Sequence, residues 1–166
     1  MITSIRALTP TDASDYAAIR RESLIESPLA FGSSIEDDVA VDASAVRGSL
    51  GPEWVIFGAF GPTLVGTVGL IRERKRKSAH RAVIWGTYVR RPYRGQGIGA
   101  QLMRASLERA RSWPGVSWLT LSVSTTAPAA KALYERLGFT VWGTEPAAVR
   151  YEHHTVDVDH MILELR

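Results

Sequence analysis

A glycine-rich segment at residues 89–100, Val-Arg-Arg-Pro-Tyr-Arg-Gly-Gln-Gly-Ile-Gly-Ala, constrains the fold of this chain more than any other feature. It lies between an apolar run at residues 82–89, which predicts a buried strand, and residues 101–111, whose apolar positions recur at helical spacing. The N–H groups at the start of a helix have no intrahelical partners and lie at the positive end of the helix dipole. The order strand, glycine-rich turn, helix therefore predicts an anion-binding turn.

The residue types in this turn suit a phosphate group. Gly95, Gly97 and Gly99 carry no Cβ, so the backbone can close around an anion. Arg94 can add a forked, positively charged donor. We expect the ligand to be bound by the residues Arg94, Gly95, Gln96, Gly97, Ile98, Gly99 and Ala100.

Composition narrows the class of protein. The 166 residues, 45% of them hydrophobic, suffice for one substantial core, and we expect a single domain over residues 1–166. There is no cysteine, which excludes thiolate metal sites and a covalent mechanism through an enzyme thiol. No apolar run reaches membrane-spanning length and the N-terminus lacks a signal-peptide pattern, so we expect a cytoplasmic protein without a membrane partner.

The net charge of +3 is concentrated in a basic run at residues 72–77 and in a cluster of Arg90, Arg91 and Arg94. A polyanionic ligand would explain the second cluster. We place the first on a solvated hairpin tip, because no aromatic residues interleave it as they would in a nucleic-acid site. No nucleic-acid partner is therefore expected.

Periodicity predicts an α/β domain with a mixed sheet. Strands are expected at residues 2–8, 54–60, 64–71, 82–89, 118–123, 139–142 and 155–165. Helices are expected at residues 10–25, 42–50 and 101–111, and between the helix start at residues 125–128 and Gly138. A long, mostly polar connection that contains His153 and His154 should join the last two strands.

Spacing separates three kinds of phosphate site. A Walker A loop requires Gly-Lys-Ser/Thr after a four-residue gap, which is absent. A dinucleotide fingerprint fits Gly95, Gly97 and Ala100, but it requires a carboxylate about twenty residues further on to hold a ribose. No carboxylate occurs between Glu108 and Glu135. The third possibility is a resemblance to a known family of enzymes.

Two spaced motifs resemble the GNAT superfamily of N-acetyltransferases. Arg94-x-x-Gly97-x-Gly99 is similar to its acyl-coenzyme A pyrophosphate loop, and Ala130-x-x-Leu133-Tyr134-x-x-x-Gly138-Phe139 is similar to its second signature. The resemblance extends over nearly the whole chain. It implies a mixed, mostly antiparallel central sheet of six to seven strands, flanked by about four helices and splayed at the central strand. It also implies acetyl-CoA as cosubstrate and no metal.

The resemblance assigns roles to individual positions. The backbone of Tyr88 and Val89 would bind the pantetheine arm, and the Tyr134 hydroxyl would protonate the leaving thiolate. Many members carry Asn where Ala127 stands, so we expect Ser124 or Thr126 to substitute for it.

The acceptor implied by the resemblance is a primary amine of a small molecule or a protein, attacked directly within a ternary complex. A lysine-like amine with a pKa of about 10.4 is mostly protonated at pH 7, so a base is needed. The central-strand positions that often carry an acid in relatives hold Val83, Trp85 and Thr87. The remaining candidates are Glu36, Glu73, His80, Glu152, His153 and His154. Glu36 is preferred, because its loop should border the acceptor side.

Two further alternatives follow from the resemblance. Without an evident base, a catalytically idle member that binds acyl-CoA as a sensor is the rival function. Dimers are common in the family, so a homodimer is a possible assembly.

Overall fold

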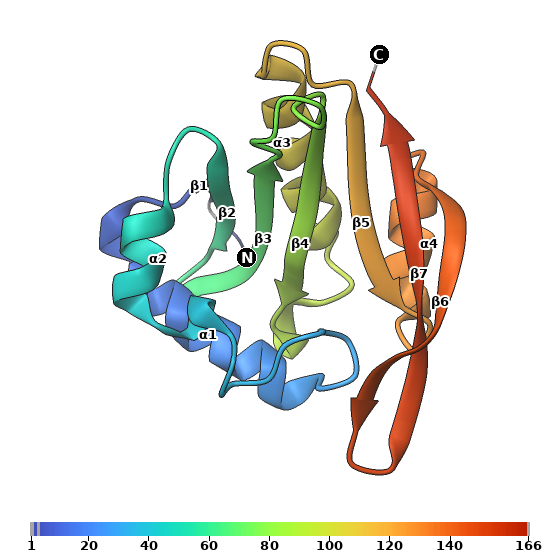
Figure 1. Cartoon of the computed structure of the whole chain (residues 1–166). Helices are drawn as coiled ribbons and strands as arrows, with labels where there is room; N and C mark the ends of the chain where they lie inside the picture. Colours follow the sequence, from blue (N-terminus) through green and yellow to red (C-terminus); the bar gives the residue numbers. More distant parts are fainter. Residues whose placement is uncertain (1, 3, 166) are drawn as a thin grey trace.

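The structure is a computed structural model that describes residue 2 and residues 4–165. These residues form a seven-stranded mixed sheet with the order β1-β2-β3-β4-β5-β7-β6 and four α-helices (Figure 1). The strands are β1 Ser4–Ala7, β2 Trp54–Phe60, β3 Leu64–Arg72, β4 Arg81–Val89, β5 Trp118–Ser124, β6 Thr140–Tyr151 and β7 His154–Glu164. The helices are α1 Ala13–Glu26, α2 Ala43–Ser49, α3 Ile98–Ser112 and α4 Pro128–Arg136. The expected fold class is confirmed.

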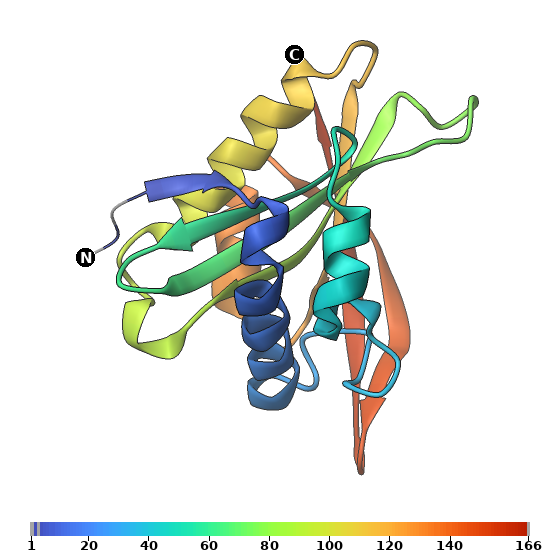
Figure 2. The same cartoon turned by 90° about the vertical axis from the view of Figure 1, so that its left-hand side faces the viewer.

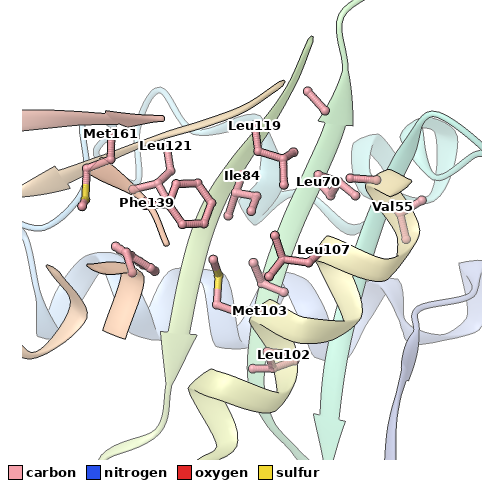
Figure 3. Close-up of a cluster of buried hydrophobic side chains, with 14 of the residues drawn as sticks. Val55, Leu70, Ile84, Leu102, Met103, Leu107, Leu119, Leu121, Phe139 and Met161 are labelled. Atoms are coloured by element: carbon pink, nitrogen blue, oxygen red, sulfur yellow. The ribbon is translucent and has the colours of Figure 1, made fainter. Parts of the chain in front are cut away.

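Strand alternation distributes the core over two faces of the sheet. In β2, Val55 packs in the cluster on the α3 side, whereas the next residue, Ile56, packs in the cluster on the α1 side. Figure 3 shows the larger cluster, in which Leu102, Met103 and Leu107 of α3 face the strands. This cluster continues beneath β5 and β7, so that α3 and α4 cover one face while α1 and α2 cover part of the other (Figure 1).

The central strand separates from its neighbour, as the resemblance implied. β4 and β5 form the one parallel pair among the described strands, and they pair at three positions, Arg81 with Trp118 through Val83 with Thr120. Beyond Val83 the two strands diverge (Figure 1). On its other edge, β4 has an irregular register against β3 near Gly86, which has a φ of +61°. An L side chain rarely adopts this backbone, so glycine suits the position.

The C-terminal hairpin corrects the prediction for the last strands. The last strand, expected at residues 155–165, is β7 at His154–Glu164. The strand expected at residues 139–142 is much longer, because β6 runs to Tyr151 and only two residues form the turn in place of the long polar connection. Periodicity did not predict the full length of β6, because this strand is mostly exposed and therefore lacks an alternating apolar pattern. A register shift between Glu145 and Val149, which includes Ala147 at φ +53°, also interrupts it.

The other boundaries differ less. α3 begins at Ile98, three residues before the predicted start, and a short 3-10 turn at Pro10–Asp12 precedes α1. The basic run lies at the tip of the β3–β4 hairpin, as predicted, and Figure 2 shows this tip extending away from the body of the molecule. Of the helices that the structure describes, none combines the length and apolar character needed to cross a membrane.

Candidate active site

The glycine-rich loop presents an unusual set of free backbone donors. Gly95 and Gly97 both have φ near +75°, and α3 begins immediately afterwards at Ile98. Within the described chain, six consecutive N–H groups lack a hydrogen-bond partner, those of Gly95, Gln96, Gly97, Ile98, Gly99 and Ala100. Six donors at the positive end of a helix dipole form a site for an anion. Binding of a ligand by residues 94–100 stays a prediction, which this backbone geometry suits.

The glycines of the loop serve two different purposes. A Cβ built on Gly95 or Gly97 meets nothing within 4 Å, so these positions require glycine for their positive φ and not for space. A Cβ on Gly99 would lie 3.3 Å from Leu133 Cδ2, so here glycine lets α3 approach α4 closely.

The cationic side chains near the loop are paired with carboxylates of α1. Arg94 donates from Nε to the carbonyl oxygen of Val89 (2.7 Å) and from Nη2 to Glu26 (2.9 Å). We expected its guanidinium to point towards the anion site of the loop, but these hydrogen bonds direct it towards β4 and α1. Arg91 also donates to Glu26 (3.1 Å), and Arg90 donates to Glu22 (2.9 Å). The loop amides are therefore the backbone donors of this region that have no partner within the described chain, whereas these guanidiniums already donate to α1.

Tyr88 contributes its backbone to the edge of the splay and its side chain to α1. The single hydrogen of its hydroxyl is shared between Glu22 Oε1 (3.1 Å) and Glu26. Burial raises the pKa of Tyr88, and the hydrogen bond to Glu26 raises it further. The hydrogen bond from Tyr88 is also the main reason why the pKa of Glu26 is lowered. The end of β4, including Tyr88 and Val89, is thereby anchored to α1.

Tyr134 lies beside the opening between β4 and β5. It is buried on α4 and lines a hollow of about 90 Å³ together with Gly86, Thr87 and Ser124. Burial raises the pKa of Tyr134, an effect that a hydrogen bond with the Thr87 side chain partly offsets. The phenol therefore stays protonated at neutral pH and can act as an acid.

At the start of α4, Ala127 occupies the position where many members of the resembled family carry Asn. Ala127 precedes the helix and offers no side-chain cap. The hydroxyl oxygens of Ser124 and Thr126 lie 2.8 Å apart, and Ser124 Oγ accepts a hydrogen bond from the Thr126 N–H (3.3 Å). The predicted substitutes thus lie at the helix start, where Ser124 also lines the hollow.

A larger cleft of about 500 Å³ opens on the α1 side of the sheet. Its lining comes from α1, the loop that follows it, and strands β4 to β7, and includes Arg20, Phe31, Trp85, Gly86, Ser122, Ser124, Glu145 and His160. Gly86, Ser122 and Ser124 line the Tyr134 hollow as well, so the two spaces meet at the splay. This arrangement leaves room for a second reactant on the side of the sheet opposite α4.

Arg20 forms part of the wall of this cleft. Its Nε and Nη2 donate to the buried carboxylate of Asp38 (3.1 and 2.5 Å), and its guanidinium lies 4.8 Å from the Phe31 ring centroid. The loop after α1 is thereby held against the cleft.

Glu36 does not line the cleft. It is fully exposed and borders a separate depression with Leu24, Ser34 and Tyr151. A hydrogen bond from its own backbone, followed by one from Ser34, lowers the pKa of Glu36, which weakens it as a base. The other predicted bases, Glu73, His80, Glu152, His153 and His154, lie on hairpin ends and do not line the cleft either.

Two residues that line the cleft and could act as a base were not selected from the sequence. Glu145 and His160 come from β6 and β7, and His160 pairs with Ser122 in the β5–β7 register. Ser122, Glu145 and His160 lie close together only because β5, β7 and β6 pair, and this pairing cannot be read from the sequence. Among the described residues, no group of three or more His, Asp or Glu side chains is arranged to hold a metal ion.

Comparison with known proteins identifies relatives. The model of the Acetyltransferase (GNAT) family matches residues 21–139, well over half of the chain. L-methionine sulfoximine/L-methionine sulfone acetyltransferases of Pseudomonas aeruginosa and Pseudomonas paraeruginosa are 35% identical over 78 residues, which is 47% of this chain and 45% of theirs. The match thus spans less than half the length of these curated relatives.

Solved structures share the fold. A phosphinothricin acetyltransferase from Sinorhizobium meliloti, in complex with acetyl-CoA, superimposes with a TM-score of 0.85 at 21% identity, over 99% of this chain and 89% of that one. A GCN5-related N-acetyltransferase from Kribbella flavida gives a TM-score of 0.81 at 23% identity, over 98% and 97%.

Proposed function

Because the chain belongs to the acetyltransferase (GNAT) family, we propose that it transfers the acetyl group of acetyl-CoA directly to a small-molecule primary amine in a ternary complex. The observation that carries this proposal is the arrangement of three features along β4. The 500 Å³ cleft and the hollow beside Tyr134 share Gly86 of β4, and the loop with the free amides of residues 95–100 follows the end of the same strand.

The loop suits the pyrophosphate of the donor. Each charge-assisted hydrogen bond from a loop amide would contribute about 1.5–3 kcal/mol. The backbone of Tyr88 and Val89 borders the splay, so the pantetheine arm would lie there. Acetyl-CoA supplies an activated acetyl group, and Tyr134 would give its proton to the departing thiolate.

The cleft suits a small acceptor. Its volume of about 500 Å³ lies in the usual range for small-molecule sites, and the Phe31 loop forms one wall. The curated relatives are named for acetylating methionine sulfoximine and methionine sulfone, and a structural neighbour for phosphinothricin. We therefore take methionine sulfoximine and phosphinothricin as the first acceptors to test, and we treat residues 1–166 as one domain with this activity.

The test is release of coenzyme A thiol from acetyl-CoA in the presence of a panel of amines, with the acetylated product identified by mass spectrometry. The panel contains the two acceptors above, amino acids, polyamines, aminoglycosides and short peptides. We expect at least one small-molecule amine to be acetylated with saturation kinetics. If none reacts while calorimetry shows tight acetyl-CoA binding, the chain is an idle acyl-CoA-binding member of the family.

A further inference from the structure

We propose that Ser122, His160 and Glu145 form a proton relay that removes the proton from the acceptor's ammonium group. This proposal rests on the proposed acetyltransferase function and names its base. The three side chains come from three adjacent strands, β5, β7 and β6, and all line the 500 Å³ cleft.

The hydrogen bonds between these side chains are continuous. Ser122 Oγ lies 2.9 Å from His160 Nδ1, and His160 Nε2 lies 3.0 Å from Glu145 Oε2. The ring of Trp142 stacks on the imidazole at a centroid distance of 5.5 Å and an angle of 27°. The imidazole is therefore fixed on both nitrogens and on one face.

The direction of these bonds follows from the chemistry of the groups. A carboxylate can only accept, so His160 Nε2 carries the hydrogen in its bond to Glu145. In the neutral ring, Nδ1 is then the acceptor, and the Ser122 hydroxyl donates to it. The remaining lone pair of Ser122 Oγ can accept a hydrogen from a third group. A relay with a free accepting end is thus built into the cleft wall.

That free end lies at the point where the two reactants would meet. Ser122 lines both the cleft and the hollow that contains Tyr134 and Thr87, whereas Glu145 and His160 line the cleft alone. No described helix covers this face of β5, β7 and β6, and α4 lies behind it in Figure 1. An amine entering the cleft can therefore approach Ser122 while the acetyl group lies beside Tyr134.

Ser122, His160 and Tyr134 together account for every proton that moves during the transfer. One proton of the ammonium passes to Ser122 Oγ as the Ser122 hydroxyl proton passes to His160 Nδ1, which leaves an imidazolium paired with Glu145. The free amine forms a bond to the acetyl carbon, and the carbon–sulfur bond breaks. The thiolate takes the Tyr134 proton, the new amide nitrogen returns one proton to Tyr134 through water, and His160 releases its proton to solvent.

Among the described residues, the charged side chain in contact with the His160 imidazole is Glu145. Across the cleft, Arg20 of α1 is paired with Asp38. Asp159, the neighbour of His160 in β7, points to the α4 side, where Lys131 and Thr144 hold it. Glu145 is therefore a positioning residue, which orients the ring and stabilises its positive charge.

The test compares His160→Gln and Ser122→Ala with wild type and with His153→Gln. His153 is an exposed histidine in the β6–β7 turn and is the matched control. Loss of a general base typically lowers the rate by about 100-fold or more. We expect kcat/KM at pH 7 to fall by about this factor in His160→Gln, by a smaller factor in Ser122→Ala where water can replace the hydroxyl, and to stay within about twofold in His153→Gln.

The pH profile separates a proton relay from a structural role. As pH rises towards the pKa of the amine, about 10.4 for a lysine-like group, the free amine becomes abundant without a base. The ratio of wild-type to His160→Gln kcat/KM should therefore shrink towards one at high pH. Glu145→Gln should lower kcat while leaving KM for the acceptor almost unchanged.

Three results would overturn the relay. One is a constant ratio of wild type to His160→Gln across the pH range, and another is a loss in His153→Gln equal to that in His160→Gln. The third is wild-type enzyme carrying one acetyl group on Ser122 after incubation with acetyl-CoA, because Ser122 would then be a nucleophile. If wild type acetylates no amine at all, the proposed function fails, whereas an active wild type with an unaffected His160→Gln variant overturns the relay alone.

Discussion

Arg94 Nε donates a 2.7 Å hydrogen bond to the carbonyl oxygen of Val89, and thereby holds the glycine-rich loop against the end of β4. The same guanidinium donates to Glu26 of α1 and lies 5.5 Å from the ring centroid of Tyr88. Its function is therefore to hold the strand end, the loop and α1 in one arrangement. Through these contacts we expect Arg94 to support ligand binding indirectly, and the direct phosphate contact that its place in the motif predicts stays a prediction.

Replacing Arg94 by Ala should weaken acetyl-CoA binding by about tenfold, because the loss of one charge-assisted hydrogen bond of about 1.5–3 kcal/mol loosens the loop. Arg91→Ala is the control, since it removes the same charge from a more exposed partner of Glu26. Calorimetry should show less than about a twofold change for it. Equal losses in the two variants would mean that net charge, and not the tie to Val89, matters.

Tyr134→Phe should lower kcat at least about tenfold with little change in KM, as expected for a group that acts at the leaving thiolate. Burial raises the pKa of this phenol, so it holds its proton at neutral pH. Tyr151→Phe, on the exposed end of β6, is the matched control. Equal kcat values for wild type and Tyr134→Phe would show that the Tyr134 hydroxyl has no catalytic role and that the side chain only packs in the core.

Stability should decline on acidification through two buried carboxylates. Arg6 holds the pKa of Asp12 far below its usual range, and Lys131 lowers the pKa of Asp159. Because the folded-state pKa values lie below the unfolded value of about 3.9, the stabilisation is full above about pH 5 and is lost as pH falls towards the folded-state values. Urea unfolding from pH 6 to 3 should show a flatter dependence in Asp12→Asn/Asp159→Asn than in wild type. Parallel curves would contradict this account.

The buried pair of Arg20 and Asp38 should matter far more than surface pairs. Asp38→Ala leaves a guanidinium with 7% side-chain exposure unpaired, which costs about 3–5 kcal/mol. Arg74→Ala, at a side chain that is 77% exposed, should cost less than about 1 kcal/mol. Urea unfolding measures both, and similar losses would show that Arg20 finds another partner.

Local signals in the sequence predict the backbone of the glycine-rich loop and the helix that follows it. The glycines at 95 and 97, the helix that follows and the position of Tyr134 depend on short-range backbone rules and on spaced motifs. The extent of β6 could not be predicted, because an exposed strand with a register shift carries no alternating apolar pattern.

The cleft on the α1 side of the sheet depends on contacts between distant segments. Ser122, Glu145 and His160 lie close only through the pairing of β5, β7 and β6, and Arg94 reaches Glu26 from a loop 68 residues away in sequence. Glu36 was preferred for its loop, yet that loop directs it to another depression. Residue type and position along the chain do not specify such contacts.

The central claim, that residues 95–100 bind the pyrophosphate of acetyl-CoA, is tested most directly by calorimetry of acetyl-CoA with Gly97→Asp and Gly115→Asp. Both glycines have a positive φ, +75° and +77°, and open space around the missing Cβ, so both variants carry similar backbone strain. Only Gly97→Asp places a carboxylate among the free amides. We predict no detectable binding by Gly97→Asp and wild-type affinity for Gly115→Asp, whereas wild-type affinity in a folded Gly97→Asp variant would contradict the account.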